Sequence, residues 1–253
     1  MTARFFHTLP IHPDAKQVTL NNDTSHHAVQ VLRLKQGDPV ILFDGTGGEF
    51  SGCLVQVRKS ACVVKIEQHL PVERESPLML TLAQAVCTNE KMDWIIQKAV
   101  EQGVIYIQPL ITNRTLIRLT GERADKRWQH WQKIIISACE QCGRNRIPQL
   151  LPLMSLSHWL EQKLLQKQEN SNLSGRDIIL SPVARLRLAE LSPPESGECI
   201  TLLTGPEGGF TEEETDAMLH AGFIPICLGT RILRTETAAL AAIAAAQVLW
   251  GDY

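Results

Sequence analysis

The alternation of apolar and polar residues divides the chain into two parts with different rhythms. In the first part, short runs rich in Val, Ile and Leu are separated by turn residues, which predicts β-strands over residues 28–34, 39–43, 49–57 and 61–68. Asp44-Gly45 and Gly47-Gly48 lie between two of these runs and predict a hairpin loop, because such residues accept positive φ at little cost. The pattern indicates a small barrel or sandwich, followed by a linker over residues 71–77.

From residue 78 onward, strand-like and helix-like patterns alternate, which is typical of an α/β domain. The longest helical pattern carries apolar residues three or four positions apart, from Trp128 to Cys142. Polar stretches over residues 170–175 and 191–198 predict surface loops. The predicted strands span residues 78–86, 104–111, 178–181, 200–204 and 224–228, and the predicted helices span residues 91–102, 123–142, 157–168, 212–221 and 237–250.

Composition narrows the class of protein. The 253 residues are 44% hydrophobic, which is enough for a core and too much for a disordered chain. The longest apolar run, residues 238–246, is too short to span a bilayer, and residues 1–16 lack the features of a signal peptide. The seven cysteines are odd in number and scattered, which favours a reducing compartment. We therefore expect a soluble cytoplasmic protein.

The charge is segregated along the chain. A net charge of −2 taken alone argues against general affinity for polyanions. Residues 114–146, however, hold eight Lys or Arg against three acids, whereas residues 195–216 hold seven acids and no Lys or Arg. Such asymmetry suggests a localised polyanion site, although a charge run by itself is more often a solvated helix face.

Two strand-to-helix turns are the candidate chemistry. In the first, the apolar run 200–204 leads into Gly-Pro-Glu-Gly-Gly-Phe over residues 205–210, and Thr211 with Glu214 forms a capping-box pattern at the next helix. Glycines there let backbone atoms approach a ligand closely, but the spacing matches neither a dinucleotide fingerprint nor a P-loop. The acidic helix start favours a neutral or cationic ligand. The second turn, residues 228–237, carries Arg231 and Arg234 and leads into a helix of small residues.

Metal and redox alternatives are weaker. Cys139 and Cys142 form one CxxC pattern inside a predicted helix, with no second pair to complete a zinc site, so burial on a helix face is the better interpretation. His26 and His27 have no partner set for a metal, and the tryptophans fall mostly on predicted helices as core residues. No metal site is predicted.

The residues also resemble a known family. The stretch 205–210 and the sequence Leu-Gly-Thr-Arg-Ile-Leu-Arg-Thr-Glu-Thr-Ala over residues 228–238 resemble the two signature motifs of the RsmE family, the 16S ribosomal RNA (uracil-N3) methyltransferases of the SPOUT class. Weaker matches run in order from Arg4-Phe5-Phe6 to Pro148, so the resemblance covers nearly the whole chain. Gln102-Gly103 stands where the family more often has Leu-Gly.

The resemblance implies an α/β fold of two domains: a PUA-like β-barrel over residues 1–72 and a SPOUT-type, trefoil-knotted domain over residues 73–253. It further implies a homodimer and S-adenosylmethionine as cofactor. The residues expected to line the cofactor pocket are Leu180, Ser181, Pro182, Leu203, Thr204, Gly205, Glu207, Gly208, Gly209, Cys227, Leu228, Gly229, Ile232 and Leu233.

The implied reaction is methylation at N3 of a specific uracil, position 1498, of 16S rRNA within the small ribosomal subunit. Because the uracil N3 proton leaves with difficulty at neutral pH, Arg234 and Arg114 are the candidates for stabilising the developing anion or holding a phosphate. Glu207 or Glu236 could accept the proton, and the sequence does not decide between them. The expected RNA contacts are Arg4, Arg33, Lys91, Arg144 and Arg146.

Two alternatives stay open at this point. A SPOUT enzyme could methylate another rRNA or tRNA atom, and a relative without turnover could serve as an RNA-binding ribosome-assembly factor. The intact glycine turns favour the enzyme, because a non-catalytic protein does not need an open cofactor loop.

Overall fold

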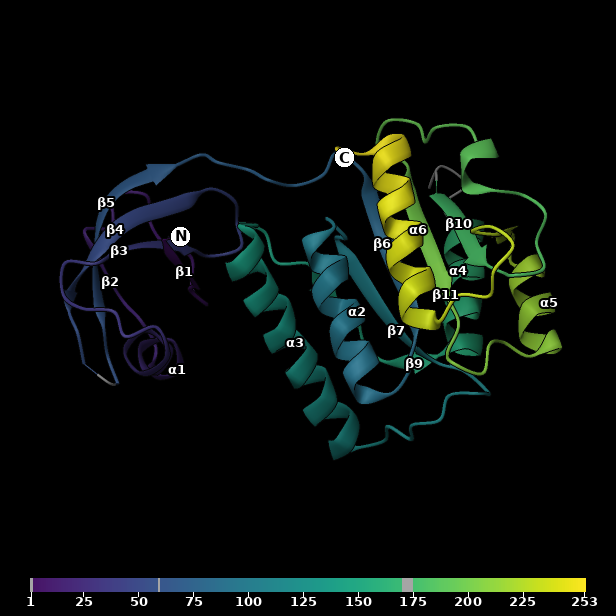
Figure 1. Ribbon diagram of the computed structural model, residues 1–253, viewed down its shortest axis with the longest axis horizontal. Helices are drawn as coiled ribbons and strands as arrows, with labels where there is room; N and C mark the ends of the chain where they lie inside the picture. Colours follow the sequence, from purple (N-terminus) through teal and green to yellow (C-terminus); the bar gives the residue numbers. More distant parts are fainter. Residues whose placement is uncertain (1, 59, 170–174) are drawn as a thin grey trace. The chain divides into compact units, whose positions relative to one another are not determined.

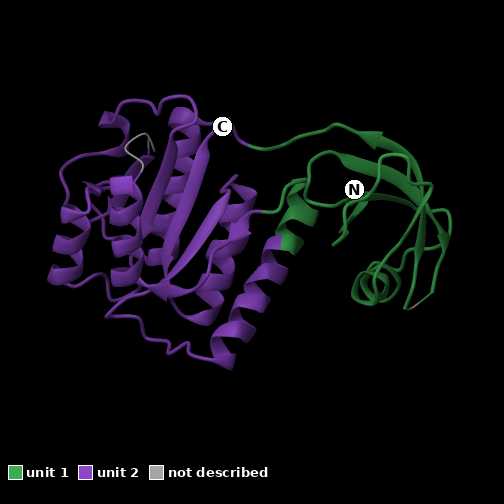
Figure 2. Cartoon of the chain, turned by 180° about the vertical axis from the view of Figure 1, so that it is seen from behind, with its two compact units in different colours: residues 1–75, 136–147 green, residues 76–135, 148–253 purple. Residues whose placement is uncertain are grey.

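The computed structural model describes residues 2–58, 60–169 and 175–253. The predicted loop over residues 170–175 therefore lies almost entirely outside the described residues. The chain forms two compact units, one of residues 1–75 and 136–147 and the other of residues 76–135 and 148–253 (Figure 2). The expected domain boundary lies between residues 72 and 73. The first unit also contains residues 136–147, which come from far along the chain.

The first unit is built on a five-stranded sheet in the order β1-β3-β4-β5-β2. Strands β3, β4, β5 and β2 pair antiparallel, and β1 joins β3 in parallel. Alternate residues of β4 are buried, so one face of the sheet faces a core that includes Phe5, Leu42, Leu54 and Val64. The strands are β1 (Ala3–Phe6), β2 (Gln17–Thr19), β3 (Pro39–Phe43), β4 (Glu49–Gln56) and β5 (Val63–Leu70).

One predicted strand of this unit is wrong. Residues 28–34 fall largely in a π-helical turn, His27–Val31, that continues directly from the short helix α1 (Asn22–His26). Asn21 begins the helix by accepting a hydrogen bond from the Thr24 amide at 2.8 Å, a cap that competes with the extended conformation. The sequence pattern also missed β1 and β2, which are too short to show a period of two.

The second unit is a parallel α/β sheet in the order β12-β10-β11-β6-β7-β8, with β9 also paired to β7 (Figure 1). The prediction of α/β alternation is confirmed, and the predicted strands and helices lie within a few residues of their expected places, whereas the two-residue strands β8 and β9 were not predicted. The strands are β6 (Met79–Ala85), β7 (Tyr106–Ile111), β8 (Gln149–Leu150), β9 (Met154–Ser155), β10 (Gly175–Leu180), β11 (Cys199–Thr204) and β12 (Ile224–Ile226).

Helices cover both faces of this sheet. Helices α2 and α6 pack side by side on one face, while α4 and α5 cover the other, where Trp159, Leu160, Met218 and Phe223 share a core with strand residues (Figure 1). The helices are α2 (Asn89–Glu101), α3 (Glu122–Cys142), α4 (Leu156–Glu169), α5 (Glu212–His220) and α6 (Thr235–Trp250), with a short 3₁₀ turn at Leu188–Glu190.

The end of α3 belongs to the first unit, and its beginning belongs to the second. Among the described residues, no helix is both long and apolar enough to cross a membrane.

Candidate functional site

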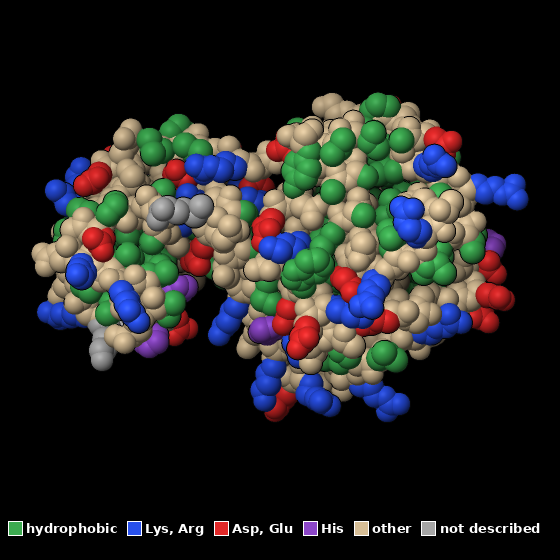
Figure 3. All heavy atoms as spheres, viewed as in Figure 1, with side chains coloured by type: hydrophobic (Ala, Val, Ile, Leu, Met, Phe, Trp, Pro, Cys, Tyr) green, Lys and Arg blue, Asp and Glu red, His purple; other side chains and the backbone are tan. Residues whose placement is uncertain are grey.

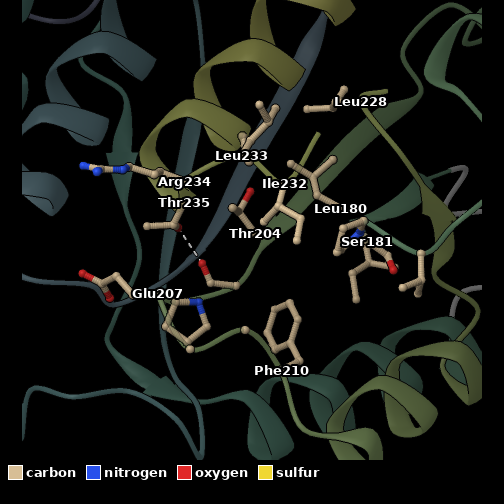
Figure 4. A pocket seen from close by; sticks show the side chains of 18 of the residues that line it. Leu180, Ser181, Thr204, Glu207, Phe210, Leu228, Ile232, Leu233, Arg234 and Thr235 are labelled. Atoms are coloured by element: carbon tan, nitrogen blue, oxygen red, sulfur yellow. Dashed lines mark hydrogen bonds between the residues drawn. The ribbon is translucent and has the colours of Figure 1, made fainter. Parts of the chain in front are cut away.

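A pocket of about 530 Å³ opens at one edge of the parallel sheet, and we call it the strand-end pocket. Strands β12, β10 and β11 are neighbours and run parallel, so the segments that follow them leave the sheet at the same edge. Those segments, around residues 181–183, 205–210 and 228–234, supply most of the pocket lining (Figure 4). The pocket therefore joins three stretches that are far apart in the sequence.

The walls of the strand-end pocket are mainly apolar. Leu180 and Ile232 lie across the hollow from Phe210, and Leu228 and Leu233 line the pocket beyond them, farther from Phe210 (Figure 4). An apolar cavity of this size with a few polar groups is the usual form of a small-molecule site. The walls suit a flat, weakly polar group such as a purine ring.

The glycine turn packs closely against an arginine. A Cβ on Gly208 would lie 3.2 Å from Cβ of Arg114, so a larger residue there would push Arg114 aside, and Gly209 has a positive φ of 68° that favours glycine. The Arg114 guanidinium donates a hydrogen bond from Nη1 to the Gly208 carbonyl oxygen at 2.9 Å. The predicted catalytic Arg114 thus braces the turn from outside the pocket and is itself exposed.

The start of α6 is tied to the same turn. Thr235 Oγ1 donates to the carbonyl oxygen of Gly205 at 2.6 Å and accepts from Gln84 Nε2 at 3.2 Å. Thr204 Oγ1 is buried with no hydrogen-bond partner among the described residues. A buried hydroxyl without a partner is uncommon, so Thr204 is available to a ligand in the pocket it lines.

Glu207 places a negative charge at the pocket. Its Oε1 accepts hydrogen bonds from the backbone amide and the hydroxyl of Thr88, each at 3.0 Å, and lies 3.3 Å from Nζ of Lys91. Burial opposes ionisation, but the hydrogen bonds from Thr88 and Lys91 outweigh it and hold the pKa of Glu207 below its ordinary value. Glu207 is therefore a carboxylate at neutral pH.

Lys91 lies between two carboxylates. Its Nζ is 3.3 Å from Glu207 and 3.9 Å from Glu236, which lies in the first turn of α6. Oε2 of each glutamate is buried without a hydrogen-bond partner in the described part of the chain. Cys87 is close by, but burial and the charge of Glu207 raise the pKa of its thiol to about 12. Cys87 is thus a neutral thiol and a poor nucleophile.

The structure brings together most of the residues predicted to bind a cofactor. All of them except Leu203 and Cys227 line the strand-end pocket. Leu203 is fully buried in the core beneath it, and the Cys227 backbone bonds to the Leu186 carbonyl beside it. Arg234 lines the pocket and lies on the same side as Glu207 (Figure 4).

Sequence reasoning missed several lining residues. Lys91 was expected at an RNA surface, yet it lines this pocket. Phe210 ends the glycine-rich motif at residues 205–210, and its position in that motif was the signal that could have placed its ring in the wall of the pocket. Val183, Thr215 and Ile226 carry no local signal, because only the fold brings them to the pocket.

Two of the predicted RNA contacts need correction. The Arg4 side chain is 8% exposed and donates to Glu49 at 2.6 Å and to Asn145 Oδ1 at 2.6 Å. The Arg144 side chain is 4% exposed and forms an ion pair with Glu75. A buried guanidinium held by a carboxylate would have to break that pair to reach a phosphate, so both are structural groups of the first unit.

The remaining predicted contacts are accessible. Arg33 is exposed and has a positive φ of 55°. The Arg146 side chain is 53% exposed and pairs with Glu73 at 3.2 Å, a surface ion pair of small net value. For both, a role in RNA binding stays a prediction.

Comparison with known proteins agrees with this architecture. Residues 74–247 match the RNA methyltransferase domain family, and residues 20–67 match the RNA methyltransferase PUA domain family. A ribosomal RNA small subunit methyltransferase E of Buchnera aphidicola (subsp. Schizaphis graminum) is 37% identical over 93% of this chain and 92% of its own length. The protein of that name from Bacillus subtilis is 29% identical over 94% of each chain.

Two solved structures resemble the whole chain. A putative methyltransferase from Legionella pneumophila, in complex with the cofactor S-adenosylmethionine, has a TM-score of 0.91 at 36% identity, and both chains are fully covered. A ribosomal RNA small subunit methyltransferase E from Neisseria gonorrhoeae, bound to S-adenosylmethionine, has a TM-score of 0.89 at 36% identity, also with full coverage of both chains.

Together, the fold and the matched domains define an RNA methyltransferase with a SPOUT-type α/β domain and a PUA-like β-barrel, which confirms the expected fold class. The chain belongs to the ribosomal RNA small subunit methyltransferase E family.

Proposed function

We propose that this protein transfers a methyl group from S-adenosylmethionine to N3 of a specific uracil in 16S rRNA of the small ribosomal subunit. The strand-end pocket carries the proposal, because its three lining segments include the two motifs that mark the family. The full-length resemblance to two structures bound to S-adenosylmethionine supports the choice of cofactor.

The residues of the pocket fit this cofactor. The apolar walls around Leu180 and Phe210 suit the adenine, and the partnerless Thr204 hydroxyl and the open backbone of the glycine turn offer polar contacts. The Glu207 carboxylate tolerates a nearby cationic sulfonium. When bound, S-adenosylmethionine supplies an electrophilic methyl group, so the protein has to supply position and to handle a proton.

Loss of the N3 proton is the step that needs help. The N3 edge of uracil is its pairing edge, so the target nucleotide has to be unpaired or extruded. Arg234 is exposed at the pocket, and its side chain has no hydrogen bond or ion pair among the described residues. We assign it to the developing uracil anion, with Arg114 at the adjoining turn as a second cation. Arginine itself stays protonated and does not act as a base.

A carboxylate beside Lys91 is the proton acceptor in this proposal. Glu207 already accepts from Thr88 and Lys91, and its lowered pKa makes it a weak base. Oε2 of Glu236 lies 3.9 Å from Nζ of Lys91, too far for a hydrogen bond. This buried oxygen has no hydrogen-bond partner among the described residues. We therefore assign proton acceptance, directly or through water, to Glu236. Glu207 supplies the negative charge near the cationic sulfonium.

We also propose that the working unit is a homodimer that acts on rRNA in the cytoplasm. Val183 and Ile232 are each 87% exposed at the rim of the strand-end pocket. Large apolar side chains left this exposed favour coverage by another surface. A second copy of this chain would close the rim and complete the pocket.

Calorimetry with S-adenosylmethionine, followed by methyl transfer to small ribosomal subunits from a strain lacking the modification, tests the function. We expect binding and one methyl group on a uracil N3, located by mass spectrometry of the digested RNA. Absence of binding at millimolar S-adenosylmethionine would refute the proposed methyltransferase activity. Methylation at another atom would keep the reaction class and refute the assigned target.

A further inference from the structure

A second hollow of about 390 Å³ lies on the unit that holds the strand-end pocket, and we call it the basic groove. Four of the eight residues that line it are cationic, namely Arg118, Arg123, Lys126 and Arg127, and His130 adds a fifth basic group. None of the lining residues carries a carboxylate. The groove therefore carries positive charge, opposite in sign to the acidic start of α5 that follows the glycine turn.

The basic groups converge because of helical spacing. Positions 123, 126, 127 and 130 recur at intervals of three and four residues near the start of α3, so they share one face of that helix. Arg118 approaches from the preceding loop, and Asn89 comes from the first residue of α2. Lys and Arg side chains gather at the edge of the second unit where α3 begins (Figures 1 and 3).

Part of this charge is compensated and part is not. Asp93 lies 2.7 Å from His130 Nε2 and 3.8 Å from Arg127, so it holds those two groups in place. Among the described residues, Lys126 forms an ion pair with Glu122 alone, at 3.5 Å, and both side chains are largely exposed. Arg118 and Arg123 are exposed and form no ion pair or hydrogen bond within the described residues. Two guanidinium groups are thus available to an anion.

The basic groove and the strand-end pocket share no lining residue, but two short stretches of the chain connect their linings. Asn89 lines the groove, and its neighbour Thr88 donates two hydrogen bonds to Glu207. Arg118 lines the groove, and Arg114, four residues earlier, bonds to the carbonyl of Gly208. An RNA chain whose target uracil lies at the Arg234 side of the strand-end pocket could therefore lay an adjacent nucleotide in the groove.

We propose that the basic groove binds the sugar-phosphate backbone next to the target nucleotide, with Arg118 and Arg123 as phosphate ligands. One guanidinium group can donate two parallel hydrogen bonds to two oxygens of a phosphate. Ile117 and Leu119, both half-buried, offer apolar surface to a ribose or base. An extruded nucleotide needs its flanking backbone held, and the groove supplies that grip. This inference rests on the proposed function, because RNA is the substrate in both.

The test compares Arg118→Ala and Arg123→Ala with Lys133→Ala. Lys133 is an exposed cation of the same helix that does not line the groove, so its removal changes the net charge equally. Two quantities are measured at several salt concentrations: affinity for a labelled single-stranded RNA by fluorescence anisotropy, and KM for small ribosomal subunits. Urea unfolding and calorimetry with S-adenosylmethionine check that fold and cofactor site are unchanged.

We expect each groove variant to lose roughly three- to tenfold in RNA affinity near 0.1 M salt and to raise KM by a similar factor with kcat unchanged. The salt dependence should be shallower by about 0.7–1 in log–log slope for each arginine removed, with no such change for Lys133→Ala. Equal effects in all three variants, or unchanged slopes, would overturn the proposal. Absence of methyl transfer in the wild type would instead refute the proposed function, while the anisotropy measurement would still decide the groove.

Discussion

The hydroxyl of Thr235 donates a hydrogen bond to the carbonyl oxygen of Gly205 at 2.6 Å. This bond joins the first residue of α6 to the glycine turn that follows β11, so two of the three lining segments of the strand-end pocket are fastened at their base. Gln84, which is fully buried, donates to the same hydroxyl and fixes its orientation. The shape of the pocket thus depends on a buried polar chain that does not have to touch the ligand.

Replacing Thr235 with Val should weaken cofactor binding. The change keeps the shape of the side chain but leaves the Gly205 carbonyl without its donor, and one such bond is worth about 0.5–1.5 kcal/mol. We expect the Kd for S-adenosylmethionine to rise roughly two- to tenfold in calorimetry. Thr235→Ser restores the hydroxyl and should bind as the wild type does. Equal loss in both variants would contradict the role of the bond.

The two glutamates beside Lys91 should respond differently to loss of charge. Because Glu236 is the assigned proton acceptor, Glu236→Gln should lower kcat by about 10²-fold or more. Glu207→Gln should mainly weaken cofactor binding, because the pKa of Glu207 is held below its ordinary value and makes it a weak base. The reverse pattern in single-turnover kinetics would assign the base to Glu207.

Lys91 should matter for activity, whereas a lysine on the same helix should not. Lys91→Met removes the cation shared by Glu207 and Glu236 and leaves two carboxylates to repel each other. We expect roughly tenfold slower methyl transfer from this loss of compensation. Lys98→Met breaks the pair with Glu101 at 2.8 Å, which does not involve Glu207 or Glu236, and serves as the control. Similar rates for the two variants would show that Lys91 is dispensable.

Arg144 and Arg146 should separate stability from RNA binding. Arg144→Ala leaves Glu75 without its buried partner and should destabilise the first unit by roughly 3 kcal/mol in urea unfolding. Arg146→Ala removes an exposed pair and should change stability by less than about 0.5 kcal/mol while weakening RNA affinity a few-fold. An Arg146 variant with unchanged RNA affinity at low salt would remove that residue from the interface.

Asp177 should make the free energy of unfolding depend on pH. Its buried carboxylate on β10 pairs with Lys163 and with Lys167 at 2.9 Å, both on α4; burial opposes its charge, but the lysines prevail and lower its pKa. A lowered pKa in the folded state contributes stability above about pH 4, which is lost as the pH falls through the folded-state value.

Asp177→Asn should therefore cost roughly 1.5–3 kcal/mol near neutral pH, and the difference from the wild type should shrink below about pH 4. Urea unfolding at a series of pH values measures both quantities. A difference independent of pH would mean that the variant acts through packing and not through the charge.

Local sequence determined the helices and the longer strands of the second unit and the two turns that line its site. Apolar runs such as β6 and β11 are long enough to mark buried strands, and Thr211 with Glu214 forms the capping box expected at the start of α5. The glycine turn at 205–210 was evident because glycine and proline act on the backbone locally. The expected α/β fold is confirmed for this reason.

Tertiary structure decided what depends on distant partners. The parallel pairing of β1 with β3, the burial of Arg144 against Glu75 and the return of residues 136–147 to the first unit join positions far apart in the sequence. The same holds for Lys91 between Glu207 and Glu236, and for Arg118 beside Arg123 in the basic groove. Sequence periodicity reports which side of an element is apolar, whereas the charge that meets a given side chain is set by the packing of the whole unit.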